Sequence, residues 1–453
     1  WRVSEEPWMK WSEEWLDNAK IRLSAGSMGN GNVSPYSYTS EMTVSTADDI
    51  VLGGSYPSYT SVGSTVPVSL TWEKSTTYDV GLDLDFFNNR LSVSGDYYRR
   101  YTTDMYTASV ALPAVYGTGS PKGNNAEMKT DGWELSLSWR DSFKLGGKPF
   151  DYSIKAMVWD SKSVITKYVN DTGSLGTVKG FIENGGSPSS YYVGMTVGEI
   201  WGYTVAGLFR DQADIDSSAI HDFVQASDKV TRPGQVKIAD LDGNGFIDPG
   251  NFAVDDHGDL RIIGNQSPRY RYGVNLSARW NGIGLSVFLQ GVGARDWYPG
   301  SDAGMFWGKY GRPFFALIPS IHNYTDDMYS AERNNWDTAY WPRMTTYQSN
   351  GTKNWTRLLE IPNTRYIQSA AYLRVKNIQL DYSFPKHICS AIRLQGLKIY
   401  VNAENLFTFT PLHKYAPNFD PEGLSYDSDF ASAADGYTYP ILKSVTVGVN
   451  ITF

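Results

Sequence analysis

Hydrophobic and polar residues alternate strictly along several stretches of this chain. Between Tyr78 and Phe86, every second residue is hydrophobic and the residues between them are Asp or Gly. A period of two predicts a β-strand with one hydrophobic face. After Asn88-Asn89, a pair that favours the positive φ angles of a two-residue turn, the alternation resumes at Leu91. The two stretches therefore predict a β-hairpin.

The same alternation recurs as far as the C-terminus, where Val and Ile alternate with polar residues and Gly before the terminal Phe453. Each stretch is long enough to cross a bilayer as a tilted strand, for which about 9–11 residues suffice. Ten strands are predicted: 20–28, 72–87, 90–102, 127–140, 151–160, 269–281, 283–293, 369–384, 396–407 and 441–453.

The predicted connections alternate between short and long. The short turns are 88–89, 141–150, 282 and 385–395, and the long loops are 29–71, 103–126, 161–268, 294–368 and 408–440. Outer-membrane barrels have short periplasmic turns and long extracellular loops. The pattern therefore predicts an all-β chain, a transmembrane antiparallel β-barrel that occupies residues 1–453. The alternative is a soluble all-β protein, such as a propeller or a sandwich lectin, whose strands also alternate.

Ten strands in an open sheet would leave two unpaired edges in hydrocarbon, where unsatisfied backbone groups are costly. Either the ten strands close on themselves, or further strands of the barrel lie outside this sequence.

Composition agrees with a barrel and excludes several other classes. The chain has 31 Tyr, 15 Trp and 19 Phe, so it is 14% aromatic but also 19% charged. No run approaches the roughly 20 apolar residues of a membrane-spanning helix. The net charge of −8 argues against nucleic acid as a partner. Five His and one Cys exclude a zinc ribbon, an iron–sulfur cluster and an internal disulfide. The N-terminus lacks the features of a signal peptide, so we expect a mature or truncated chain.

Catalytic signatures are missing from the sequence. It contains no H-E-x-x-H, G-x-S-x-G or Walker A motif. The carboxylates of Asp83 and Asp85 lie two residues apart on one strand face, which predicts solvated or gating charges in the barrel lumen. We therefore expect a protein that is not an enzyme.

An acidic loop after residue 239 has the spacing of a calcium site. Gly245 stands at the sharp-turn position of an EF-hand-like loop, but Asn251 replaces the final bidentate Glu. Asp255, Asp256 or Asp259 can supply the missing carboxylate, or the segment is a turn that needs no metal. The candidate ligands for a structural Ca²⁺ are Asp240, Asp242, Asn244, the carbonyl of Phe246, and Asp248.

Three ordered groups of segments resemble the SusC/RagA family of TonB-dependent outer-membrane transporters. The first runs from Trp1-Arg2-Val3-Ser4-Glu5-Glu6 through Trp15-Leu16 to Gly29-Asn30. The second covers Gly234 to Asp248, then Ile263-Gly264 and Pro268. The third comprises Tyr372 to Ile378, Ile399 to Phe407, Asp420-Pro421-Glu422 and Tyr439-Pro440. Together they cover the chain from end to end.

This resemblance implies the C-terminal part of a 22-stranded barrel, without its plug domain, in the outer membrane of a Gram-negative bacterium of the Bacteroidetes type. It implies active import of oligosaccharides (glycans), energised by TonB through the missing N-terminal region, together with a SusD-like lipoprotein lid. Outer-membrane lipid would surround the barrel. The alternatives are a peptide importer of the RagA type and a passive porin or adhesin-like barrel.

The long loop 294–368 is rich in aromatic residues. Aromatic faces stack on the apolar faces of sugars, and binding sites combine apolar walls with a few polar groups. The alternatives are a core within the loop, an interface with the lid, or part of the aromatic girdle. The candidate ligand-binding residues are Trp297, Tyr298, Trp307, Tyr310, Trp336 and Trp341.

Overall fold

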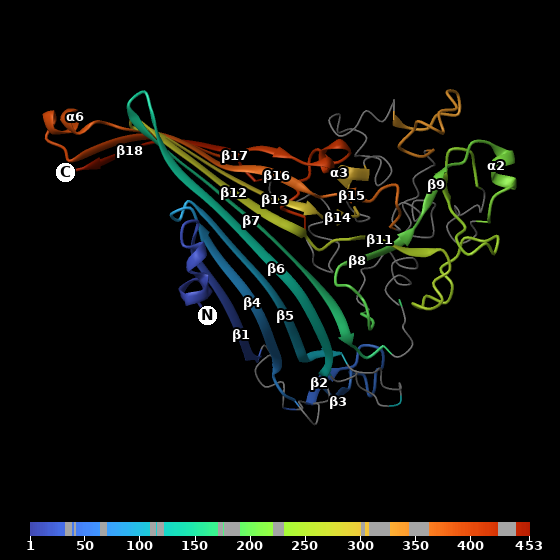
Figure 1. The fold of residues 1–453 in the computed structure, drawn as a ribbon. Coiled ribbons are helices and arrows are strands. Elements are labelled where there is room, and N and C mark those ends of the chain that lie inside the picture. Colours follow the sequence, from blue (N-terminus) through green and yellow to red (C-terminus); the bar gives the residue numbers. More distant parts are fainter. Residues whose placement is uncertain are drawn as a thin grey trace.

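The computed structural model describes residues 1–31, 39, 42–63, 70–108, 115, 122–170, 175, 191–220, 231–299, 304–307, 327–343, 362–424 and 441–453. Ten long strands form one antiparallel sheet in chain order, with β1 and β18 at its two edges (Figure 1). They are β1 (Leu16–Asn30), β4 (Glu73–Phe86), β5 (Leu91–Ala108), β6 (Lys122–Leu145), β7 (Lys148–Lys167), β12 (Arg269–Trp280), β13 (Ile283–Ala294), β16 (Tyr372–Ser383), β17 (Gly396–Phe409) and β18 (Ser444–Thr452).

All ten strands expected from the alternation are confirmed, but the turn expected at 141–150 is wrong. Strand β6 continues to Leu145, and strand β7 begins at Lys148. Only Gly146 and Gly147 form the turn between them, with φ of 58° and 75°. Two positive φ angles give a tight hairpin whose twist matches that of the strands. The strand continues through polar Asp141 and Ser142 because backbone pairing does not require hydrophobic side chains.

The other short connections lie at the same end of the sheet, which also carries both chain termini (Figure 1). Asn88 and Asn89 both have φ of 58°, and Asn281-Gly282 has 47° and 89°. The connection between β16 and β17 holds the short helix α6 (Lys386–Ala391). Two 3₁₀ helices, Val3–Glu5 and Pro7–Ser12, precede β1. Among the described residues, no helix has the length and apolar character needed to cross a membrane.

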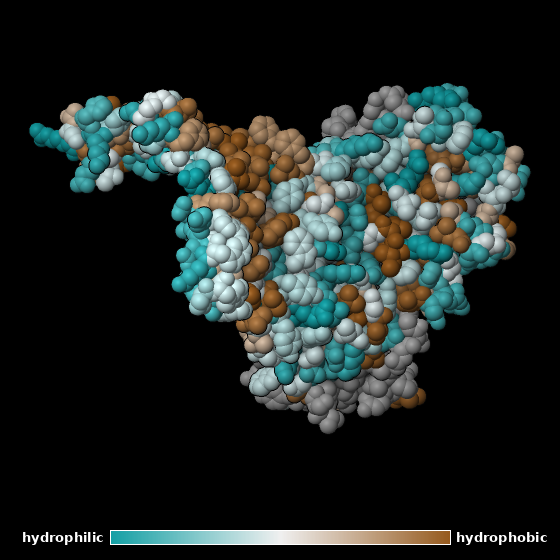
Figure 2. All heavy atoms as spheres, viewed as in Figure 1, coloured by the Kyte–Doolittle hydropathy of each residue, from teal (hydrophilic) through white to brown (hydrophobic). Residues whose placement is uncertain are grey.

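The two faces of the sheet differ in polarity. On β4, alternate side chains are exposed hydrophobics, such as Val80 (53%) and Leu82 (43%). On β18, Val447 is 73% exposed. Figure 2 shows hydrophobic residues gathered over the strands and mainly hydrophilic residues over the end that carries the long connections. We call the face of Val80 and Val447 the outer face and the opposite one the inner face.

Small elements and a hydrophobic core fill the long connections. Four two-stranded sheets form there, and so do short helices. The strand pairs are β2 (Met42–Thr46) with β3 (Ser58–Val62), β8 (Glu199–Tyr203) with β11 (Leu260–Asn265), β9 (Val205–Leu208) with β10 (Val236–Ile238), and β14 (Asp296–Trp297) with β15 (Gln368–Ser369); the helices are α2 (Gln212–Asp216), α3 (Gly304–Trp307) and η6 (Pro411–Lys414). We call the packed part of these connections the loop assembly.

Candidate functional site

The main hydrophobic core of the described chain lies in the loop assembly and not in the ten-stranded sheet. Its centre is aromatic. The rings of Trp341 and Tyr366 stack with centroids 5.6 Å apart, and Trp307 meets Trp341 edge-on at 6.2 Å. Tyr340 stacks on Tyr415 at 3.6 Å. Aromatic pairs of this kind add stabilisation beyond the area they bury. Segments far apart in sequence are thereby held in one packed body.

The structure places the aromatic ligand candidates of loop 294–368 mostly inside this core. Trp307 is 2% exposed and Trp341 is 0% exposed. Trp297 and Tyr298 are buried as well, while Trp336 is partly buried against the same core. Tyr310 lies outside the described residues. A buried ring cannot stack on a sugar in this conformation, so their positions favour the alternative of a loop core. Their binding role stays a prediction.

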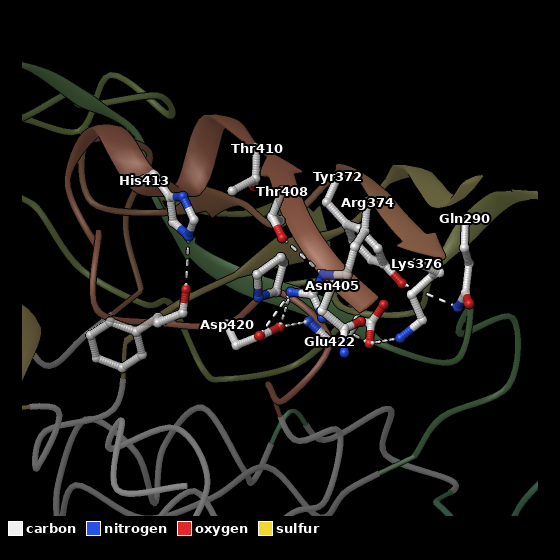
Figure 3. A network of polar contacts seen from close by, with 12 residues as sticks. Gln290, Tyr372, Arg374, Lys376, Asn405, Thr408, Thr410, His413, Asp420 and Glu422 are labelled. Atoms are coloured by element: carbon white, nitrogen blue, oxygen red, sulfur yellow. Dashed lines mark hydrogen bonds and ion pairs between the residues drawn. The ribbon is translucent and has the colours of Figure 1, made fainter. Parts of the chain in front are cut away.

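Two buried arginines fix the segment that follows η6. Arg374, on the inner face of β16, is 2% exposed; its guanidinium lies 2.7 Å from an oxygen of Asp420 and 3.0 Å from an oxygen of Glu422 (Figure 3). It also donates to Thr408 Oγ1 at 2.8 Å. Arg295, 4% exposed, donates to the carbonyls of Pro421 and Leu424 at 2.8 and 2.6 Å. The segment is thus anchored to the sheet by charge-assisted hydrogen bonds.

Sequence reasoning did not assign a role to Arg374 or to Asp420, although both belong to the segments of family resemblance. The two residues are 46 positions apart, and nothing local in the sequence pairs them. The available signal was an arginine at an inner-face position of a strand, since a charge there needs a partner.

The acidic loop brings three carboxylates together. Oxygens of Asp240, Asp242 and Asp259 lie within 4.8 Å of one another, the one such acidic group in the described part of the chain. Asp259 is one of the residues expected to complete the ligand set. Asp248 lies outside this group: its carboxylate accepts from Gly250 N at 2.7 Å and from the amide of Asn244 at 2.9 Å.

The remaining candidates of this loop make contacts typical of a turn. Asn244 Oδ1 accepts from Phe246 N at 2.7 Å. The two oxygens of Asp240 accept from the backbone N–H groups of Gly243 and Gly245 at 2.6 and 2.9 Å. Binding of a cation by Asn244 or Asp248 would therefore need these side chains to rearrange.

The electrostatics of the cluster suit a cation. Burial raises the pKa of Asp259, even though the backbone N–H groups of Leu241 and Asp248 donate to it. Hydrogen bonds from the backbone, that of Gly245 first, lower the pKa of Asp240. An ionised, buried Asp259 beside two more carboxylates is costly without a counter-charge. An all-oxygen donor set fits a hard cation such as Ca²⁺.

The inner face of the sheet carries ion pairs, and one of them includes Asp83, which was expected there as a solvated or gating charge. Arg22 of β1 lies 2.8 Å from both Asp83 and Asp96. At the short-turn end, Lys398 lies 3.3 Å from Asp381. These side chains share a face with polar residues and glycines, whereas the outer face is hydrophobic. Such a division matches a barrel with lipid outside and water inside.

Comparison with known families identifies the sheet. A family model described as "TonB dependent receptor-like, beta-barrel" matches residues 14–250, just over half of the chain. The chain belongs to this family. TonB-dependent receptor barrels of this kind are located in the outer membrane, so the outer face contacts lipid.

Curated relatives and solved structures match the whole chain. TonB-dependent receptor P3 of Formosa agariphila is 26% identical over 100% of this chain and 41% of the relative. TonB-dependent receptor SusC of Bacteroides thetaiotaomicron is 24% identical over 100% of this chain and 39% of the relative. The RagAB peptide importer in its open-open state has a TM-score of 0.70 at 19% identity, over 100% of this chain and 42% of that chain.

The chain thus spans about two fifths of the length of the receptors it matches. The likeness to RagAB shows that the fold is shared. The resemblance to the SusC/RagA type expected from the sequence is confirmed, and so are the β-barrel fold class and the outer-membrane location.

Proposed function

We propose that this chain forms the C-terminal part of a barrel that imports oligosaccharides across the outer membrane. The import would be energised by TonB and assisted by a SusD-like lipoprotein lid. Membership of the TonB-dependent receptor family, with matches to SusC along the whole chain, supports the proposal. A sheet with a hydrophobic outer face and a charged inner face supplies the wall of such a conduit.

The inner face offers groups suited to sugars. In the sheet register, Tyr98 pairs with Gly132, and Trp159 pairs with Glu134, so both aromatic rings alternate with the lipid-facing residues of their strands. Aromatic rings can stack on the apolar faces of a sugar, and neighbouring carboxylates accept hydrogen bonds from its hydroxyls. In this proposal the buried aromatic core of the loop assembly holds the mouth of the barrel in shape and does not contact cargo.

Peptides are the second candidate cargo. The RagAB structures that share this fold are described as those of a peptide importer. A peptide would use the same inner-face charges through its backbone and termini, since Arg22 and Lys398 bind carboxylates in the present structure.

Calorimetric titration of the complete transporter with its lipoprotein partner distinguishes the two cargo classes. The titrants are an oligosaccharide panel and a matched peptide panel. We expect heat of binding from oligosaccharides, and roughly threefold to tenfold weaker binding in Trp159→Ala. Trp280→Ala is the control, because Trp280 lies at the short-turn end of the outer face, where its Nε1 donates to Leu145 O. Binding of peptides alone would replace oligosaccharides by peptides as the cargo.

A further inference from the structure

A charged strip crosses the outer face just beyond the aromatic residues at the loop end of the strands. Tyr97 of β5 pairs with Trp133 of β6, and two residues further along Arg99 pairs with Asp131. Directly paired residues share a face of a sheet, and so do residues two apart on one strand. Arg99 and Asp131 therefore lie on the lipid-facing side, next to the exposed aromatic side chains of Tyr97 and Trp133.

The strip carries more positive than negative charge. Lys129 lies two residues beyond Asp131 on β6, and Lys162 pairs with Asp131 from β7. Arg99 Nε is 2.5 Å and Lys129 Nζ is 3.3 Å from the carboxylate of Asp131. The side chains of Arg99 and Lys129 are still 42% and 33% exposed. Two cations share the carboxylate of Asp131, and Lys162 adds a third positive charge on the neighbouring strand, in a chain whose net charge is −8.

An apolar groove runs along the outer face and ends at this strip. Leu23, Val80, Tyr78 and Tyr97 line it together with Arg99, Ser24 and Asp79. Leu23 is 76% exposed and Tyr78 is 54% exposed. In the register of β1, β4 and β5, Leu23 pairs with Val80 and Val80 with Tyr97. The walls of the groove therefore come from three adjacent strands.

We propose that this groove and strip bind one phosphorylated, acylated lipid of the outer leaflet. An acyl chain lies along Leu23, Val80 and Tyr97, and the phosphate bonds to Arg99 and Lys129. The guanidinium fork matches phosphate oxygens, and basic residues at a membrane surface attract anionic headgroups. Asp131 holds the two cations side by side and competes with the phosphate for them. The proposal depends on the outer-membrane location and is independent of the cargo.

The test uses the complete transporter in detergent and counts bound lipid by native mass spectrometry. The probe is monophosphoryl lipid A, compared with its dephosphorylated form and with phosphatidylglycerol. The double variant Arg99→Gln/Lys129→Gln should retain about tenfold less of the phosphorylated probe. Asp131→Asn should retain more than the unchanged protein, because both cations lose their competing carboxylate. Only protein that shows heat-modifiable migration is compared, so that misfolded variants do not affect the measured amount of lipid bound per protein.

Arg90→Gln is the matched control, since Arg90 pairs with Asp141 at 3.5 Å at the short-turn end of the barrel. It should leave lipid retention unchanged. A purely structural ion pair predicts that Asp131→Asn lowers stability without raising retention, and that result would overturn the proposal. Equal retention of the dephosphorylated probe would show that the site does not recognise the phosphate. Retention of phosphatidylglycerol but not of lipid A would contradict the assignment to a lipid of the outer leaflet.

Discussion

The ring of Tyr98 lies over Gly132 on the inner face of the sheet, where the two residues pair across β5 and β6. A Cβ atom at Gly132 would be 2.3 Å from Cζ of the tyrosine. The same arrangement recurs between Tyr400 and Gly448, where the distance is also 2.3 Å. A large inner-face side chain can thus lie flat against the sheet, because the paired residue has no side chain.

Substitution of this glycine should displace the ring. We expect Gly132→Ala to lower the free energy of unfolding by about 1–3 kcal/mol, the range for overpacking, and Tyr98→Ala in the same chain to recover part of the loss. Urea unfolding of the barrel in lipid vesicles measures both. Gly26→Ala is the control, because no atom lies within 4 Å of its Cβ position. Equal losses at Gly26 and Gly132 would contradict the role of the ring.

Because Arg374 anchors Asp420 and Glu422, its substitution should lower stability strongly. Arg374→Gln leaves two carboxylates near one another without the buried guanidinium, and we expect the free energy of unfolding to fall by about 3–5 kcal/mol. Limited proteolysis should then cleave within 411–424 much faster. Arg2→Gln breaks an exposed pair with Glu5 and should cost roughly 0–1 kcal/mol. Unchanged protease resistance in Arg374→Gln would show that the segment is held by its other contacts.

Calcium binding by the acidic loop is open to direct measurement. Affinity in the weak extracellular range, about 10⁻⁴–10⁻³ M, is expected because the final bidentate Glu is replaced. Added Ca²⁺ should slow proteolysis of residues 231–268 with a midpoint in that range, and a chelator should reverse it. Asp259→Asn should abolish the protection, whereas Asp255→Asn should retain it. If added Ca²⁺ does not change the rate of proteolysis, the segment is a turn that binds no metal.

The terminal strand gives a prediction about assembly. Val447 faces lipid, so Val447→Arg should cost about 2–4 kcal/mol near the midplane and reduce the heat-modifiable fraction in the outer membrane. Asn450→Ala should be milder, because residue 450 alternates with the lipid-facing valines. Deletion of Phe453, 82% exposed at the end of the chain, should also lower outer-membrane levels. Equal levels of all three variants would contradict this role of the strand.

The strands were predictable because alternation is a local property that one lipid-facing surface imposes on each strand. The ends of the strands were less predictable. Strands β6 and β7 extend past the hydrophobic pattern as far as Gly146-Gly147, because the positive φ angles of these two glycines set the position of the turn. The order in which the strands pair could also be predicted from the sequence, since short turns join neighbouring strands in an antiparallel sheet.

The loop assembly was not predictable in the same way. Trp307 and Trp341 are suitable for stacking on a sugar and equally suitable for packing on one another, and composition does not separate the two. In the structure these residues pack on one another and on more distant residues, as Trp341 does on Tyr366, 25 residues later in the chain, and their sugar-binding role stays a prediction. In the acidic loop, the regular spacing pointed to Asp240, Asp242 and Asp248, whereas the fold brings Asp259 and not Asp248 next to Asp240 and Asp242; metal binding by this group stays a prediction.

Uptake of a fluorescent oligosaccharide by cells that carry the complete transporter tests the central proposal most directly. Uptake should saturate with concentration and should fall to the level of transporter-deficient cells when TonB is removed, while the protein stays in the outer membrane at its usual level. Uptake that persists without TonB and rises in proportion to concentration would contradict active import and indicate a passive pore.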